Sequence, residues 1–151
     1  MSLNEYKKKR KFSETPEPEG NLKKSKGKKL IYAFQKHQAS HLHWDLRLEM
    51  DGVLKSWAVP KEPPKEKGVK RLAMQTEDHP MGYEKFSGII PEGNYGAGKV
   101  EVWDSGKYEL KEKDPKKIEI ILYGKKLKGN YVLIKTHYGS KPEKSWLFFK
   151  I

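Results

Sequence analysis

The sequence predicts an all-β protein, a single compact antiparallel β-barrel of about eight short strands with minor helical segments. Segments in which apolar and polar residues alternate recur along the chain, and glycine, proline and Asp-Gly turn signals separate them. No segment keeps helical periodicity over about 12 residues. The 151 residues are enough for one domain, and a hydrophobic content of 35% implies a small core.

Nine short segments have the alternation, or the β-branched and aromatic content, of strands. They cover residues 30–36, 42–50, 53–59, 71–76, 99–103, 107–110, 118–123, 130–137 and 145–151. Asp51-Gly52 is a strong two-residue hairpin signal between the second and third of them. Asp104, Ser105 and Gly106 are predicted to form the turn of another hairpin.

The remaining segments are assigned by their glycine and proline content. Residues 88–98 hold four glycines and are predicted to form a loop; they lack the Gly-Lys-Ser/Thr of a Walker sequence. Pro80 is expected to end the fourth strand, and residues 111–117 to form one helical turn. Four tryptophans alternate with polar residues on the strands and are expected in the core. They are Trp44, Trp57, Trp103 and Trp146.

The amino-terminal 29 residues differ from the rest in composition. They carry ten of the 32 basic residues, so composition alone predicts a disordered tail. Pro16 and Pro18 restrict the backbone around Glu17, which favours a segment held against the body of the protein. We therefore expect a basic extension at residues 1–29 and a barrel domain at residues 30–151.

The net charge of +12 and the pI near 9.6 favour a polyanionic partner, of which nucleic acid is the commonest. A lysine-rich surface is also typical of thermophile proteins, so both interpretations stay open. The chain has no cysteine, which excludes disulfides and thiolate metal sites. It has no signal-type or membrane-spanning apolar run, so we expect a cytoplasmic monomer.

A second clue is the choice between the two basic side chains. The chain uses Lys 29 times and Arg three times, at Arg10, Arg47 and Arg71. Each Arg is therefore a candidate for a position that needs a planar, bidentate donor to phosphate or carboxylate.

Potential metal ligands gather on the strand at residues 42–50. Same-face side chains on a strand stand about 6.5–7 Å apart, so His43, Asp45 and Arg47 form one row opposite the apolar face. His37, six residues before His43, is expected nearby as a third ligand. Two imidazoles and one carboxylate suit manganese, zinc or iron. The competing interpretation is that this row is the solvated face of a strand.

Several motifs then resemble the 3′-phosphoesterase domain of bacterial DNA ligase D end-joining enzymes. The resemblance runs from about Tyr6 to the carboxyl terminus, and Tyr83 belongs to it as a single residue. Its other motifs are Gln35-Lys36-His37, Leu42-His43-Trp44-Asp45-Leu46-Arg47-Leu48-Glu49, Asp51-Gly52-Val53-Leu54-Lys55-Ser56-Trp57-Ala58-Val59-Pro60-Lys61, Glu77-Asp78-His79-Pro80 and Ile90-Pro91-Glu92-Gly93-Asn94-Tyr95-Gly96-Ala97-Gly98. The chain looks like a stand-alone prokaryotic member.

The resemblance implies a manganese-dependent enzyme, with zinc or cobalt as alternatives, that heals 3′ ends. It implies removal of a terminal ribonucleoside and then of the 3′-phosphate, at the 3′ ends of DNA or RNA–DNA primer-templates. It further implies a separate ligase and polymerase as partners, and a nucleoid-associated location in the prokaryotic cytoplasm without membrane contact.

The resemblance also implies roles for individual residues. The metal ligands of the family correspond to His37, His43 and Asp45. Its catalytic residues that contact the phosphate correspond to Arg47, His79 and Tyr83. Lys61 and Arg71 correspond to further basic residues that bind phosphate. The supporting positions correspond to Arg10, Glu17, Gln35 and Glu77. Lys11 stands where the family commonly has Asp, a departure that bears on the diesterase step.

Two other function classes are open to the same residues. His43, Asp45 and a distant His137 have the ingredients of an iron oxygenase triad, although no arginine follows His137 to bind a keto acid. A non-catalytic basic barrel would bind nucleic acid ends without a metal. Outside these sets, His41 and His137 are expected to be exposed or structural, and the lysine runs at 23–29 and 125–128 to be solvated.

Overall fold

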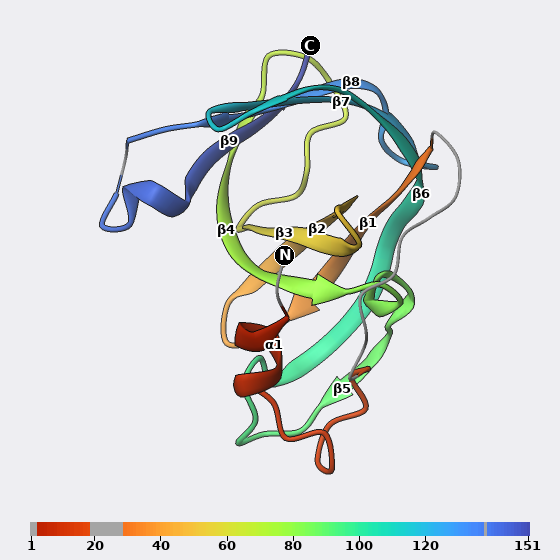
Figure 1. The fold of residues 1–151 in the computed structure, drawn as a ribbon, viewed down its shortest axis with the longest axis vertical. Helices are drawn as coiled ribbons and strands as arrows, with labels where there is room; N and C mark the ends of the chain where they lie inside the picture. Colours follow the sequence, from red (N-terminus) through yellow and green to blue (C-terminus); the bar gives the residue numbers. More distant parts are fainter. Residues whose placement is uncertain (1–2, 19–28, 138) are drawn as a thin grey trace.

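The computed structural model describes residues 3–18, 29–137 and 139–151, and β-strands make up most of them (Figure 1). The strands are β1 (Leu30–Gln38), β2 (Leu42–Met50), β3 (Val53–Val59), β4 (Lys70–Pro80), β5 (Gly88–Ile90), β6 (Gly98–Asp114), β7 (Lys117–Tyr123), β8 (Lys128–Lys135) and β9 (Ser145–Lys150). The described helical segments are short: α1 (Asn4–Lys8) and the 3-10 helices η1 (Tyr83–Lys85) and η2 (Pro142–Lys144). No described helix has the length and apolar character needed to span a membrane.

Eight of the strands close into an antiparallel barrel. Their order is β1-β2-β3-β4-β9-β8-β7-β6, and β6 pairs again with β1 to complete the ring. The short strand β5 adds to β6 outside the ring. Closure leaves none of these eight strands as a free edge, which removes the usual site of unwanted strand pairing. The predicted barrel of about eight strands is confirmed.

The β2–β3 hairpin forms as its turn residues predict. Asp51 and Gly52 have φ angles of 53° and 82°, which are the two positive values that a type I′ turn requires. The turn pairs Met50 with Val53 and fixes the register of both strands. That register sends alternate residues of β2 to opposite faces of the sheet. Consequently the polar row of this strand lies on the face opposite the core.

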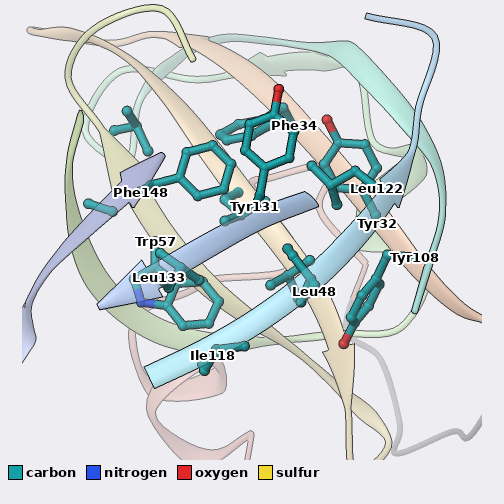
Figure 2. Close-up of a cluster of buried hydrophobic side chains, with 14 of the residues drawn as sticks. Tyr32, Phe34, Leu48, Trp57, Tyr108, Ile118, Leu122, Tyr131, Leu133 and Phe148 are labelled. Carbon is teal, nitrogen blue, oxygen red and sulfur yellow. The ribbon is translucent and has the colours of Figure 1, made fainter. Parts of the chain in front are cut away.

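The interior of the barrel is filled by aromatic and branched side chains. Figure 2 shows Phe34, Tyr131 and Phe148 directed towards one another between the strands. The rings of Tyr131 and Phe148 are stacked at 5.1 Å, and Phe34 meets Phe148 edge-on at 5.7 Å. Three of the four tryptophans are buried in this core, as predicted: Trp44, Trp57 and Trp146. Trp103 is only partly buried, because it is the extra residue of a bulge in the β1–β6 pairing.

The predicted hairpin around residues 104–106 is wrong, because β6 continues through them as one strand. Asp104 directs its carboxylate to the β7–β8 turn, where it accepts hydrogen bonds from the backbone N–H groups of residues 125–127. At Gly106 a Cβ would lie 2.3 Å from the Tyr123 carbonyl oxygen. Gly106 therefore allows the end of β7 to approach β6 closely, and Asp104 binds the turn that follows β7. Neither residue forms a turn in β6.

Two smaller predictions also differ from the structure. The helical turn expected at 111–117 is wrong: β6 and β7 meet in a tight turn, where Asp114 accepts from the N–H groups of Lys116 and Lys117. Within the predicted loop at 88–98, residues Gly88–Ile90 pair with β6 as β5. In both places a local hydrogen bond or a distant strand decides the conformation, and the composition of the segment does not.

The described part of the amino-terminal segment packs against the barrel, although its composition favours disorder. Tyr6 in α1 is fully buried and forms a small second core with Leu54 and Tyr83. Helix α1 packs on β4, and Figure 1 shows it at the same end of the barrel as β5. Residues 19–28, with most of the second lysine run, lie outside the described residues.

Candidate metal and phosphate site

The polar row of β2 lines a cleft of about 310 Å³ on the face opposite the core. Strands β1, β2 and β4, the amino-terminal segment, η1 and the loop before β6 all contribute to it. The residues that line it are Arg10, His37, Ala39, His43, Asp45, Arg47, Ala58, Thr76, Glu77, His79, Tyr83, Tyr95 and Gly96. Asp45 and Arg47 are buried in this cleft, so the interpretation of the row as a solvated face is wrong.

Three potential metal ligands converge where β1 and β2 pair. His37 and His43 are direct partners in the antiparallel register, and Asp45 is two residues further along β2. One ligand atom from each lies within 4.8 Å of the others. His37 Nδ1 is 3.5 Å from one Asp45 oxygen and His43 Nε2 is 3.3 Å from the other.

The other nitrogen of each imidazole is held by a backbone carbonyl. His37 Nε2–H donates to the Gly96 carbonyl at 2.7 Å, and His43 Nδ1–H donates to the His41 carbonyl at 3.0 Å. These bonds leave His37 Nδ1 and His43 Nε2 directed at the Asp45 carboxylate. An imidazole that donates one N–H to a carbonyl is the usual support of a metal-binding histidine, so this donor set fits a divalent cation.

The charge state of the group also suits a metal. Burial alone would raise the pKa of Asp45, but Arg47 and the two imidazoles hold it well below its usual range. Asp45 is therefore a carboxylate at neutral pH. Burial lowers the pKa of His43, but its hydrogen bond to Asp45 and the carboxylate charge outweigh this and raise it above the ordinary value. A divalent cation would replace that proton as the partner of the carboxylate.

Arg47 is held beside this group by neutral and charged partners. Its Nε donates to the Gln35 side-chain oxygen at 2.9 Å, and one terminal nitrogen is 3.6 Å from Asp45. Gln35 is fixed in turn, because its amide nitrogen donates to the carbonyls of Tyr83 and Phe86. Gln35 therefore has its oxygen directed at the arginine, which leaves the guanidinium in a set orientation at the wall of the cleft.

His79 lies between two guanidinium groups. Its Nδ1–H donates to the Glu77 carbonyl at 2.9 Å, and its Nε2 accepts from Arg10 at 3.3 Å. Arg47 approaches the same ring at 3.2 Å. Burial and the charges of both arginines hold the pKa of His79 well below its ordinary value, so the imidazole is neutral. An anion bound between the arginines would remove part of that repulsion and raise the pKa.

Comparison of the sequence with known protein families shows to which family the chain belongs. A family model described as the DNA Ligase D 3′-phosphoesterase domain matches residues 35–135. The chain belongs to this family.

The chain is similar over most of its length to three bacterial proteins named LigD. The multifunctional non-homologous end joining protein LigD of Pseudomonas aeruginosa is 47% identical over 155 residues, which cover 98% of this chain and 18% of that protein. LigD of Mycobacterium tuberculosis, described as a DNA repair protein, is 47% identical over 139 residues, which cover 89% and 18%. LigD of Mycolicibacterium smegmatis is 44% identical over 156 residues, which cover 96% and 20%. The chain therefore spans about a fifth of the length of these relatives.

In this member of the 3′-phosphoesterase family, the amino-terminal segment adds an arginine to the cleft. Arg10 binds Glu17 at 2.9 Å and Glu77 at 3.0 Å, and both of these carboxylates are buried. The Tyr83 hydroxyl donates to the same Glu17 oxygen at 2.6 Å. Burial raises the pKa of Tyr83 well above its ordinary value, so the phenol stays protonated. The chain Tyr83–Glu17–Arg10 thus connects η1, the amino-terminal segment and β4.

Strand β4 presents its two site residues through a bulge. Leu54 pairs with His79 and Ser56 with Thr76, so Lys55 on β3 opposes two residues of β4, Glu77 and Asp78. The bulge directs Glu77 and His79 to the cleft, while Asp78 binds Lys55 at 3.1 Å. Bulges of this kind are common beside active sites, where they redirect side chains.

Two of the residues assigned to phosphate binding by resemblance lie outside the cleft in the described structure. Lys61 is exposed in the loop after β3, and Arg71 donates to the Glu62 carbonyl at 2.9 Å from the start of β4. Their roles in phosphate binding stay predictions. His41 and His137 are exposed, as expected, so His137 is not part of the His-His-Asp group and the oxygenase triad is not assembled.

The sequence predicted no role for Lys9 or Tyr95. Lys9 binds Glu77 at 3.2 Å and lies 3.4 Å from the Tyr95 hydroxyl. Tyr95 lies within the 90–98 motif, in the segment 88–98 that was predicted to form a loop because it holds four glycines.

Proposed function

We propose that the protein is a metal-dependent phosphoesterase that heals 3′ ends. It removes a terminal ribonucleoside and then a 3′-phosphate from DNA or RNA–DNA primer-templates, and it leaves a 3′-hydroxyl for end joining. The observation that carries the proposal is one cleft in which a His-His-Asp group stands beside Arg47, Arg10 and His79.

The position of Asp45 favours a metal. A buried carboxylate in a phosphate-binding cleft repels its substrate unless a cation intervenes. His37, His43 and Asp45 would hold manganese, with zinc or cobalt as alternatives. The cation would supply an activated water and neutralise charge on the phosphoryl group.

The chain's own residues bind and orient the phosphate. Arg47 and Arg10 offer N–H groups to its non-bridging oxygens, where charge redistributes as the ester bond breaks. An anion bound between the arginines would offset their charge and raise the pKa of His79, which would allow the imidazole to donate a proton to the leaving 3′ oxygen.

Tyr83 acts first through Glu17. A direct bond from its hydroxyl to phosphate requires it to leave that carboxylate. In this structure the Tyr83 hydroxyl therefore fixes Glu17, and Glu17 fixes Arg10.

The setting of the reaction is part of the proposal. A net charge of +12 favours encounter with nucleic acid ends, without sequence readout. We place the protein, as a monomer, with a ligase and a polymerase of an end-joining system in the prokaryotic cytoplasm near the nucleoid.

A gel assay tests the function. A 5′-labelled primer-template that ends in a 3′-phosphate or in one ribonucleotide is incubated with manganese and the parent, His43→Ala, Asp45→Ala or His41→Ala. The exposed His41 is the matched control, because its side chain is outside the ligand group. The parent and the control should form a 3′-hydroxyl product, and the two ligand variants should lose about 10²–10³-fold in rate. If the parent binds the duplex but forms no product with manganese, zinc or cobalt, a non-catalytic binding module replaces the enzyme.

A further inference from the structure

Two cavities adjoin the central cleft, and they differ in charge. The first, which we call the lysine groove, shares Glu77 and Tyr95 with the cleft and is also lined by Lys9, Lys141 and Lys144. The second, the glycine groove, shares Gly96 with the cleft, and Glu92 is the only charged residue in its described lining. A chain that leaves the cleft therefore meets lysines on one side and an acid on the other.

Each acid of the lysine groove already has a basic partner. Glu77 binds both Arg10 and Lys9, and the remaining acid of the groove, Glu5, lies 3.5 Å from Lys9. The two other lysines, Lys141 and Lys144, are exposed at the two ends of η2. Neither has an acidic side chain within ion-pair distance among residues 3–18, 29–137 and 139–151. Their ammonium groups are thus available to a bound anion.

Tyr95 stands at the border between the lysine groove and the cleft. Its side chain is 48% exposed, and its ring lies 4.6 Å from the Lys9 ammonium and 5.4 Å from the Arg10 guanidinium. An exposed aromatic ring next to cations that face phosphate is the arrangement that proteins use to stack a base of single-stranded nucleic acid.

We propose that the nucleic-acid strand that ends in the reacting 3′ group leaves the cleft through the lysine groove. Its terminal base stacks on Tyr95, and its next backbone phosphates bind Lys141 and Lys144. The strand carries a negative charge at each nucleotide, so Glu92 disfavours the alternative path through the glycine groove. The inference rests on the proposed function, which supplies the 3′ end in the cleft, and it adds the direction of the strand.

Binding measurements test this without catalysis. Fluorescence anisotropy with a 5′-fluorescein primer-template that ends in a 3′-hydroxyl gives Kd for the parent and for Lys141→Ala/Lys144→Ala over a range of salt concentrations. Loss of two phosphate contacts should weaken Kd about tenfold and reduce the slope of log Kd against log salt by about 1.4–1.8. The matched control is Lys111→Ala/Lys116→Ala, which removes two exposed charges from the β6–β7 hairpin, outside all three cavities. Equal losses in both double variants would overturn the proposal.

The stacking residue has its own pair of variants. Tyr95→Ala should weaken Kd about tenfold, whereas Tyr95→Phe keeps the ring and should bind within about threefold of the parent. Equal Kd values for parent and Tyr95→Ala would contradict a stacking role.

Turnover separates this inference from the proposed function. Thymidine 3′-monophosphate has no upstream phosphate, so the ratio of kcat/KM for an oligonucleotide to that for the mononucleotide should fall about tenfold in Lys141→Ala/Lys144→Ala. If the parent hydrolyses neither substrate, the proposed function fails, and the Kd values alone decide the strand path. If the parent hydrolyses both and the double variant binds like the parent, the function stands and the strand path is wrong.

Discussion

Arg47 and Arg10 reach the same histidine from two different parts of the molecule. Arg47 comes from the barrel, where strand pairing on both sides of β2 and a neutral amide oxygen fix it. Arg10 follows α1 in a segment that the described sheet does not include, and two buried carboxylates hold it. One guanidinium is therefore positioned by the fold and the other by charge.

This difference separates what the two arginines can do. The position of Arg47 depends on the whole barrel, and a local opening does not release it. The position of Arg10 depends instead on its two ion pairs and on the contacts of Tyr6, because the described residues 3–18 belong to no strand of the sheet. The same cleft thus combines a wall built by the barrel with a wall that side-chain contacts hold in place.

The largest effect is expected at Arg47, on the wall of the cleft that the barrel builds. Arg47→Lys keeps the charge but loses the forked donor and the bond to Gln35, so kcat/KM for 3′-phosphate removal should fall about 10²-fold. Thermal unfolding of the same preparation checks that the barrel is intact. Activity within threefold of the parent would show that a point charge is sufficient at this position.

Substitutions of the residues that position Arg10 should show coupled effects. Glu17→Gln and Tyr83→Phe each break the chain that positions Arg10, and each should lower kcat/KM about tenfold. Because both act through Arg10, the double variant should lose little more than either single one. Fully additive losses would instead mean that Tyr83 acts on the substrate by itself.

Acid stability should report the crowding of His79 by both arginines. The pKa of His79 is held well below 6.5 in the folded protein, so below about pH 6.5 the unfolded chain binds a proton that the folded one does not. The stability from this group is present above that pH and is lost as the pH falls. The raised pKa of His43 acts with the opposite sign, so the informative quantity is the difference from His79→Gln. Tm between pH 5 and 8 should fall less steeply in that variant, and identical curves would exclude a neutral buried His79.

The smallest effect is expected at Lys9, a partly exposed residue of the amino-terminal segment. Lys9 is one-third exposed and binds Glu77, which keeps Arg10 as a second partner. Lys9→Ala should therefore cost less than about 1 kcal/mol of stability by denaturant titration. A loss of stability as large as that of Arg10→Ala would show that the amino-terminal segment is held mainly through Lys9.

The parts that the sequence predicted are those in which the cause is local. The alternation of β2 and the Asp51-Gly52 turn are sufficient to place His43, Asp45 and Arg47 in one row. To bring His37, the third candidate ligand, to this row, only the neighbouring strand has to pair in register.

The parts that were missed have causes far away in the chain. Asp104 and Gly106 have the composition of a turn, but the contacts that decide their role come from residues 123–127. The ion pair between Arg10 and Glu77 joins residues 67 positions apart, so no pattern within the basic segment predicts it. Resemblance to a family pointed to Arg10 and Glu17, whereas charge composition pointed to disorder.

Metal binding tests the central claim most directly. Isothermal titration of chelator-stripped protein with manganese should show one site per chain in the parent and in His41→Ala, and none in Asp45→Ala or His43→Ala, with 3′-phosphatase activity rising in parallel with occupancy. Full activity in the stripped parent, or unchanged manganese binding in Asp45→Ala, would contradict the assignment of His37, His43 and Asp45 as the metal site.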